Sequence, residues 1–203
     1  MFGCAMRAWR LVSEHRASTA FDGQGSYRFG NRWNHPGVRV VYIAEHLSLA
    51  ALEVLVHTQD VNLVAYRAIP VEYDPAWVEN IETLPKDWQV DPAPASSKDI
   101  GSTWAQQGSS LLLRVPSAVV PVEFNLILNI QHPNFGKLEF AEGQEFVFDP
   151  RLNRCDRTQR LECHQQRRPQ LQHRVVTTTR LLAAKPAPCK FRMGPSTADR
   201  NAP

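Results

Sequence analysis

The sequence contains no long hydrophobic run. A membrane-spanning helix requires roughly 18 consecutive apolar residues, and charged residues or prolines interrupt the longest apolar stretches, among them Glu53, Arg114, Pro116 and Pro121. The N-terminal segment MFGCAMRAWRLV also lacks the basic region, apolar centre and small-residue cleavage site of a signal peptide. We therefore expect no membrane segment and a location in the cytoplasm.

Cysteine is scarce and absent from the central part of the chain. The four cysteines are Cys4, Cys155, Cys163 and Cys189. This distribution argues against a disulfide framework and fits a reducing compartment. Cys155 and Cys163 are also too far apart for a zinc-ligand pair, which is usually separated by about two to four residues. We expect no metal site.

Standard nucleotide-binding and hydrolase motifs are missing as well. The sequence has no GxxxxGK[ST] motif, and Gly23-x-Gly25 does not continue as a dinucleotide fingerprint because Arg28 stands where the third glycine should be. No GxSxG motif surrounds Ser117, which argues against a serine hydrolase of the nucleophile-elbow type.

Charge is distributed unevenly along the chain, although the formal net charge is only +3. Residues 1–150 contain 11 Lys and Arg against 17 Asp and Glu, a balance of −6. Residues 151–203 contain 12 basic and 3 acidic side chains, a balance of +9. Because the main body is acidic, we do not expect nucleic-acid binding by the folded domain.

This change in composition predicts a folded domain over residues 1–152 and a basic tail over residues 153–203. The tail is rich in Arg, Gln, Pro and Thr, and Phe191 is its one aromatic residue, a composition that favours disorder. A nucleic-acid-binding arm is the functional alternative, since basic side chains gain affinity by releasing counterions from phosphates. The lack of interleaved aromatic residues favours an unstructured appendage instead.

Hydrophobic patterns in residues 6–150 predict an α+β fold, with a mixed β-sheet and short helices. Strands are expected at residues 7–12, 38–44, 64–72, 110–115, 118–122, 124–129, 138–140 and 145–148. Helices are expected at residues 48–59, where apolar residues recur at helical spacing, and at residues 98–107. Residues 21–34 and 83–97 are expected to be loops. No regular strand–helix alternation indicates a doubly wound sheet.

Glu53 is the most informative single residue. It is the only charged side chain between His46 and His57, so its carboxylate must reach water or be paired on an otherwise apolar helix. One interpretation places it on the solvated side of the helix. The other places it in a cleft, where it stabilises a developing positive charge.

Four further residues have both a structural and a functional interpretation. Arg28 and Arg32 lie in the glycine-rich loop and are either surface charges or bidentate phosphate ligands. Tyr42 is either a core tyrosine with a hydrogen-bonded hydroxyl or a site residue. Ser117 either caps a turn or contributes to a site.

The order of several motifs resembles the RES domain family. The motifs are FDGQG from Phe21, GNRWN from Gly30, PG at 36–37, VVY ending at Tyr42, AALEVLVH around Glu53, VPSAVVPVEFN around Ser117, and FVFDPRL at 146–152. Together they cover about residues 7–152. The resemblance implies a toxin that consumes NAD+ and a fold similar to the ADP-ribosyltransferases.

The resemblance also implies which residues form the site. The family's active-site arginine, tyrosine and glutamate correspond to Arg32, Tyr42 and Glu53, which are expected to be catalytic. Substrate binding is expected from the family's first-strand arginine, which corresponds to Arg10 with Arg7 as the alternative, and from the serine of the VPS motif, Ser117. Arg28 and Asn34 of the glycine-rich loop are further expected substrate-binding residues. NAD+ is expected as substrate, so no cofactor is required.

The resemblance predicts cleavage of the nicotinamide–ribose bond by phosphorolysis or hydrolysis. A mono-ADP-ribosyltransferase that modifies a protein is the enzymatic alternative, and a non-catalytic binding module that uses the basic tail is the alternative of another class. The expected partners are NAD+, inorganic phosphate as one candidate acceptor, and a helical antitoxin protein of the Xre type.

Overall fold

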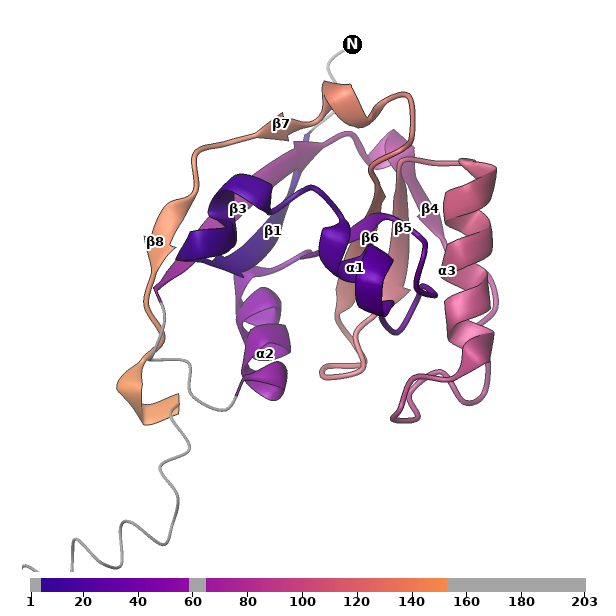
Figure 1. Ribbon diagram of the computed structural model, residues 1–203, viewed down its shortest axis with the longest axis horizontal. Helices are drawn as coiled ribbons and strands as arrows, with labels where there is room; N and C mark the ends of the chain where they lie inside the picture. The colour runs from indigo at the N-terminus through magenta and orange to yellow at the C-terminus, as the bar shows by residue number, and fades with distance from the viewer. Residues whose placement is uncertain (1–4, 59–64, 153–203) are drawn as a thin grey trace, which may run out of the picture. The chain divides into compact units, whose positions relative to one another are not determined.

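The computed structural model describes residues 5–58 and 65–152. The expected basic tail at residues 153–203 lies outside the described residues, as do all four cysteines. Eight strands form the described part of the sheet: β1 (Met6–Ser13), β2 (Val40–Ala44), β3 (Tyr66–Tyr73), β4 (Val78–Asn80), β5 (Leu112–Pro116), β6 (Phe124–Asn129), β7 (Glu139–Phe140) and β8 (Gln144–Phe146) (Figure 1).

In the described part of the chain, three α-helices and four short 3-10 helices accompany these strands. The α-helices are α1 (Gln24–Phe29), α2 (Leu47–His57) and α3 (Ala95–Gln107). The 3-10 helices are η1 (Glu14–Thr19), η3 (Pro75–Trp77), η4 (Phe135–Lys137) and η5 (Pro150–Leu152). Among the described residues, none of the helices has the length and apolar character needed to cross a bilayer.

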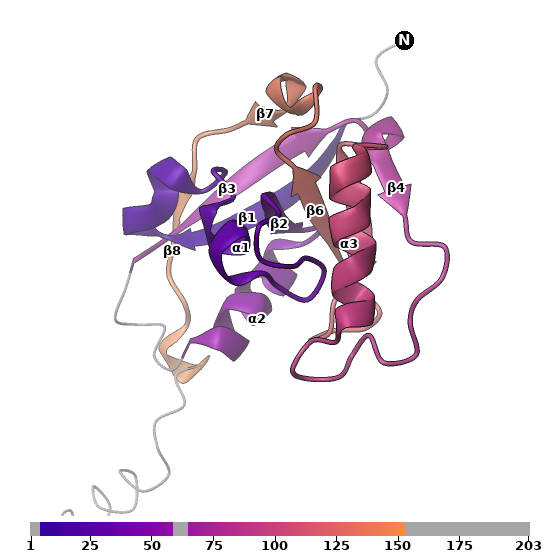
Figure 2. The same cartoon turned by 45° about the vertical axis from the view of Figure 1, so that its right-hand side comes forward.

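The sheet is mixed and follows the order β4-β5-β6-β2-β1-β3-β7, with β8 also pairing with β3. The pairing of β4 with β5 is parallel, and all other strand pairs are antiparallel. The helices α1, α2 and α3 lie on the same side of the sheet (Figures 1 and 2). This architecture confirms the predicted α+β class.

Alternating side chains of the central strands serve two separate hydrophobic clusters, as the pleat of a strand requires. Leu112 and Leu128 belong to a cluster on one face of the sheet. Leu113 and Ile127 belong to a second cluster on the other face, where Trp104 of α3 packs against them. The face of the sheet that α3 covers is therefore packed with buried apolar side chains.

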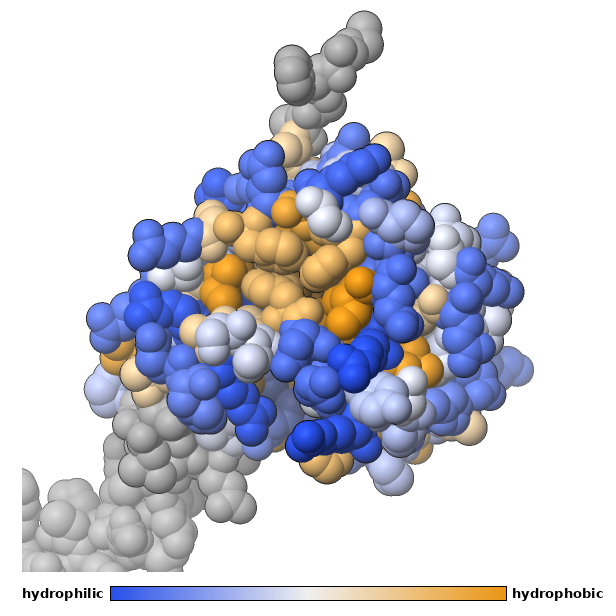
Figure 3. Space-filling view, turned by 45° about the horizontal axis from the view of Figure 1, so that its top comes forward, coloured by the Kyte–Doolittle hydropathy of each residue, from blue (hydrophilic) through white to orange (hydrophobic). Residues whose placement is uncertain are grey.

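Hydrophobic side chains also gather on one outer face of the protein, within a border of hydrophilic ones (Figure 3).

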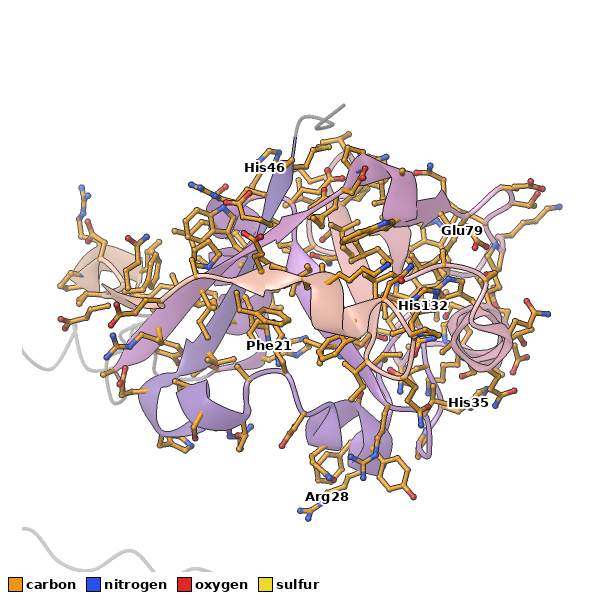
Figure 4. All side chains as sticks on the ribbon, turned by 90° about the horizontal axis from the view of Figure 1, so that it is seen from above. Phe21, Arg28, His35, His46, Glu79 and His132 are labelled. Atoms are coloured by element: carbon orange, nitrogen blue, oxygen red, sulfur yellow. The ribbon has the colours of Figure 1, made fainter. Side chains whose placement is uncertain are left out.

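Aromatic contacts connect distant segments of the chain. Phe21, labelled in Figure 4, lies with its ring centroid 4.2 Å from that of Phe140. Phe140 in turn lies 5.8 Å from Phe135. These aromatic contacts join the segment after η1 to β7 and η4.

The prediction of a continuous loop over residues 21–34 is wrong in its central part, where α1 occupies Gln24–Phe29. Six residues are too few to show a helical period, and glycines flank both ends of the helix. Gly30 ends α1 with φ = +65°, and a Cβ at this position would lie 2.7 Å from the Asn34 carbonyl oxygen. Glycine is therefore required where the chain turns from α1 into the RWN segment.

Three other expectations were wrong in part. The helix expected at 98–107 begins earlier, at Ala95, because serines that resemble a loop in sequence form its first turn. Residues 118–122 form a turn, not a strand, since two backbone N–H groups of this segment donate to Ser117 Oγ. The three-residue strand β4 was not expected, because it is too short to show alternation.

Candidate active site

A cavity of about 840 Å³ opens on the helix side of the sheet, within the size range of small-molecule sites. Its lining comes from β1, the end of α1, the loop of residues 30–34 that contains the RWN motif (the RWN loop), β2, α2, the segment before and within α3, the β5–β6 turn and the start of β6. The lining residues are Trp9, Arg10, Leu11, Phe29, Gly30, Asn31, Arg32, Trp33, Tyr42, Ile43, Ala44, Ala50, Glu53, Val54, Val56, His57, Gln89, Asp91, Ala93, Lys98, Pro116, Ala118, Val119 and Asn125.

Glu53 lies on the inner side of α2. Leu49 and Ala50 are buried against the sheet, and residue 53 follows them by one turn, so its side chain leaves the helix on the same side. The carboxylate is half-buried and lines the cavity. Its Oε1 accepts hydrogen bonds from Ser117 Oγ at 2.8 Å and from Asn125 Nδ2 at 2.7 Å. The Glu53 carboxylate thus lies in a cavity and not on the solvated side of the helix.

Tyr42 lies on β2 with its hydroxyl in a network of buried polar groups. The hydroxyl donates to Asn34 Oδ1 at 2.8 Å and accepts from the Trp33 backbone N–H at 3.2 Å. Burial raises the pKa of Tyr42 well above its usual value, so the phenol stays protonated at neutral pH. Tyr42 therefore fixes the RWN loop at the edge of the cavity.

Arg32 points from this loop toward the segment that precedes α3. Its Nη1 donates to the carbonyl oxygens of Trp88 and Val90, at 2.7 and 2.9 Å. Nη2 lies 4.0 Å from Asp91 Oδ1, and 18% of the side chain is exposed. One guanidinium nitrogen is therefore used by the fold, while the group still lines the cavity.

Arg10 brings a second guanidinium to the cavity from β1. Its Nη1 donates to the Tyr42 carbonyl oxygen at 2.7 Å, whereas Nε is buried without a hydrogen-bond partner among the described residues. Burial lowers the pKa of Arg10 to about 10, which leaves it a cation at neutral pH. Nη2 makes no hydrogen bond among the described residues, so this half-buried cation keeps a donor suited to an anionic ligand.

Helix α3 holds the backbone of the RWN loop. Ser97 Oγ donates to the Arg32 carbonyl at 2.8 Å, and Ser102 Oγ accepts from the His35 backbone N–H at 2.9 Å. At Gly101, a Cβ would lie only 1.9 Å from the Trp33 carbonyl oxygen. The loop rests directly on the helix at a point where only glycine fits.

The structure brings Arg10, Arg32, Tyr42 and Glu53 to one cavity. It places two other predicted site residues behind that cavity. Asn34 contacts the Tyr42 hydroxyl, and Ser117 contacts the Glu53 carboxylate. Both residues are 0% exposed, so their side chains offer no surface to a substrate.

Arg28 lies elsewhere. It is exposed on α1, is not part of the cavity lining, and points away from the protein body in Figure 4. The structure therefore does not bring Arg28 to the cavity, because its side chain is exposed to solvent while the neighbouring Phe29 of α1 lines the cavity.

Sequence reasoning gave no role to Asn125 or Gly101. Asn125 is the last residue of the VPSAVVPVEFN motif, and its place in a motif that resembles the family could have indicated a role in the site. Gly101 carried no sign in the sequence, because its importance comes from a contact with Trp33, far away along the chain. Among the described residues, no group of three or more His, Cys, Asp and Glu is arranged to hold a metal ion.

The fold and the cavity define an α+β protein with a ligand-sized site that is lined by the hydrogen-bonded carboxylate of Glu53 and by two arginines. The chain belongs to the RES domain family, whose sequence model matches residues 7–149. The resemblance drawn from the sequence motifs is therefore confirmed.

Relatives with known names are similar over nearly their whole length. Toxin Res of Yersinia enterocolitica serotype O:8 / biotype 1B is 38% identical over 151 residues, which cover 72% of this chain and 99% of the relative. The Prs ADP-ribosylating toxin of Sphingobium sp. strain YBL2 is 35% identical over 154 residues, covering 72% of this chain and 96% of the relative. This chain is thus a relative of bacterial toxins.

The fold is similar to a solved structure as well. A chain of the M. tuberculosis MbcT–MbcA toxin–antitoxin complex superposes with a TM-score of 0.60 at 19% identity, covering 71% of this chain and 86% of that chain. At this level of identity the likeness establishes the fold.

Proposed function

We propose that this protein is a toxin-like enzyme that cleaves the nicotinamide–ribose bond of NAD+. The observation that carries the proposal is the Glu53 carboxylate, held at one oxygen by Ser117 and Asn125 in a cavity that also contains Arg10 and Arg32. Negative charge for a ribosyl cation and positive charge for the phosphates are thereby supplied within one site.

Departure of nicotinamide from ribose C1′ leaves a transition state with oxocarbenium character, which a nearby carboxylate stabilises in glycoside hydrolysis. Glu53 supplies that carboxylate. The nicotinamide leaves as a neutral molecule from a cationic ring, so no general acid is needed. A preorganised charge of this kind typically contributes about two to three orders of magnitude in rate.

The two arginines account for the rest of the dinucleotide. Arg10 has unused donors at the cavity, and Arg32 retains Nε and Nη2 beyond the bonds that its Nη1 makes. Both are placed to hold the pyrophosphate, for which guanidinium geometry is well suited. Tyr42 packs against the ribose or nicotinamide, and Ser117 and Asn34 support the site from behind.

Three acceptors are compatible with this chemistry: phosphate, water and a protein side chain. We favour free NAD+ degradation, by phosphorolysis or hydrolysis. Transfer of ADP-ribose to a protein is the second candidate, because one relative is named an ADP-ribosylating toxin.

We further propose that an antitoxin protein of the helical Xre type covers this cavity. The name of the MbcT–MbcA toxin–antitoxin complex supports an antitoxin protein as the partner. Phe29 and Val56 line the cavity and are 80% and 55% exposed, so both offer apolar surface to a protein that covers it.

The test is incubation of the purified chain with NAD+, with and without inorganic phosphate, followed by identification of the nicotinamide and the sugar product. A phosphorylated sugar nucleotide indicates phosphorolysis, and ADP-ribose indicates hydrolysis. Labelled NAD+ with candidate proteins detects transfer. We expect Glu53→Gln to lower NAD+ consumption by about 100-fold or more while the protein stays folded. Full activity of folded Glu53→Gln protein would reject the proposal.

A further inference from the structure

We infer that Asn125 is a positioning residue that, together with Ser117, holds one oxygen of Glu53 so that the other oxygen faces the cavity. This inference rests on the proposed function of Glu53 and extends it to a residue that had no role. Asn125 Nδ2 lies 2.7 Å from Glu53 Oε1, and Ser117 Oγ lies 2.8 Å from the same oxygen. Both contacts end on Oε1.

The direction of both hydrogen bonds is fixed by chemistry. A hydroxyl has one proton and two lone pairs, and an amide nitrogen only donates. Ser117 Oγ already accepts from the backbone N–H groups of Val119 and Val120, each at 3.1 Å. Its proton is therefore directed to Glu53, and Oε1 accepts from two defined donors.

The second carboxylate oxygen is left accessible. Among the described residues, no hydrogen bond ends on Glu53 Oε2, and this atom is not one of the buried polar atoms without a partner. Glu53 itself lines the cavity. Two donors on Oε1 orient the carboxylate, so the place where Oε2 meets a ligand is set in advance, as a preorganised site requires.

Asn125 is well anchored for this task. It is the second residue of β6, and its backbone lies opposite Ala44 of β2 and Val115 of β5. Because strands flank it on both sides, a change of its side chain leaves the sheet pairing in place. The hydrogen bond to Glu53 then links α2 to β6 across 72 residues of sequence.

Four variants of the full chain test the inference: Asn125→Ala, Asn125→Asp, Glu53→Gln and the Glu53→Gln/Asn125→Ala double variant. We expect Asn125→Ala to lower kcat about 100-fold, as small misplacements of reacting groups do, with little change in KM. Asn125→Asp keeps the size but replaces the donor by an acceptor, and we expect a loss at least as large. Asn80→Ala, at an exposed position on β4, is the matched control and retains activity.

The double variant separates positioning from an independent role. If Asn125 acts through Glu53, adding Asn125→Ala to Glu53→Gln causes no further loss of rate. Losses that multiply would overturn the inference, as would an unchanged kcat in folded Asn125→Ala protein. Circular dichroism and thermal unfolding establish that each variant is folded.

A second measurement does not depend on activity. The side-chain amide signal of Asn125, identified in ¹⁵N NMR by its absence from Asn125→Asp protein, is expected to shift strongly in Glu53→Ala protein, which lacks the acceptor. An unmoved signal would overturn the inference. If the unaltered chain consumes no NAD+, the proposed function fails, while the amide signal still decides whether Asn125 holds Glu53.

Discussion

Tyr42 satisfies two polar groups that would otherwise be buried without partners. Its hydroxyl accepts from the Trp33 N–H and donates to Asn34 Oδ1, and Asn34 is 0% exposed. Asn34 Nδ2 donates in turn to three backbone carbonyls, those of Ser26, His35 and Val38. One hydroxyl on β2 thereby orders the loop that presents Arg32.

We expect Tyr42→Phe to lower the free energy of unfolding by about 2 kcal/mol, since each abandoned buried group costs about 1–3 kcal/mol. Urea unfolding measures this difference. Tyr27→Phe is the matched control: Tyr27 is 43% exposed, so its hydroxyl is hydrated and the expected change is below about 0.5 kcal/mol. Equal stabilities for the two variants would contradict a role of the Tyr42 hydroxyl in ordering the loop.

The same residue predicts a dependence of stability on alkaline pH. Burial raises the pKa of Tyr42 in the folded state, so the folded protein keeps a proton that the unfolded chain loses above about pH 10. This contribution is fully present below that pH and is lost as the pH rises. Urea unfolding between pH 9 and 11 should show a steeper fall for the unaltered protein than for Tyr42→Phe.

Arg10 predicts stabilisation by anionic ligands. A ligand that binds only the folded state at 100 times its Kd stabilises it by about 2.7 kcal/mol, so ADP-ribose or inorganic pyrophosphate should raise the Tm. We expect Arg10→Met to remove most of this shift. Arg28→Met, which changes an exposed arginine outside the cavity, should keep it. Loss of the shift in Arg28→Met alone would place the phosphate site elsewhere.

At the scale of elements, α3 serves the site without contributing a predicted site residue. Gly101 lets the Trp33 carbonyl rest on the helix, and serines on either side of it bond to the Arg32 carbonyl and the His35 N–H. The helix thus fixes three consecutive peptide groups of the RWN loop. The position of α3 therefore sets the backbone position from which the Arg32 side chain extends toward the cavity.

We expect Gly101→Ala to destabilise the protein by at least about 2 kcal/mol, because a Cβ 1.9 Å from a carbonyl oxygen forces loop and helix apart. NAD+ consumption should fall with it. Gly136→Ala is the control, since a Cβ there meets nothing within 4 Å. Thermal unfolding of both variants decides the matter, and a Gly101→Ala protein as stable as the control would show that the contact is dispensable.

Elements with a clear hydrophobic period were predictable from the sequence. The strands β1, β2, β5 and β6 and the helix α2 lie within a few residues of their expected positions. The helix α1 and the strand β4 were not, because six and three residues carry no readable period. The turn at residues 118–122 was mistaken for a strand because its valines are apolar, although Val122 is 84% exposed.

The residues of the candidate site were predictable from the family motifs, but the hydrogen bonds between them were not. Arg32, Tyr42 and Glu53 were identified from the family resemblance, and the fold brings them to one cavity. The partners of Glu53 lie 64 and 72 residues away in the chain, so no local pattern reveals them. For the same reason sequence alone did not separate Ser117, which is buried, from residues that line the cavity.

At the scale of the whole molecule, the family match ends at residue 149, and 151 residues of the Yersinia relative account for 99% of its length. A chain shortened to residues 1–152 should therefore fold and consume NAD+ at the rate of the full chain. Comparison of the two by thermal unfolding and NAD+ assay tests this expectation. Greatly reduced activity of the shortened chain would mean that residues 153–203 belong to the enzyme.

The same pair of chains addresses the non-catalytic alternative. Residues 153–203 carry 11 of the 23 Lys and Arg residues of the sequence, and binding to DNA through them would weaken steeply with salt. A DNA affinity that requires these residues, in a protein without NAD+ turnover, would favour a binding module over an enzyme.

The hydrogen bonds from Arg32 Nη1 to the Trp88 and Val90 carbonyls couple the position of the guanidinium to the position of the backbone at residues 88–90. The chain at residues 88–90 cannot leave its place without releasing the guanidinium, and the guanidinium cannot turn without abandoning that stretch of backbone. A protein that binds this segment and displaces it would therefore also displace the Arg32 guanidinium from its place at the cavity, together with Gln89, which lines the same cavity.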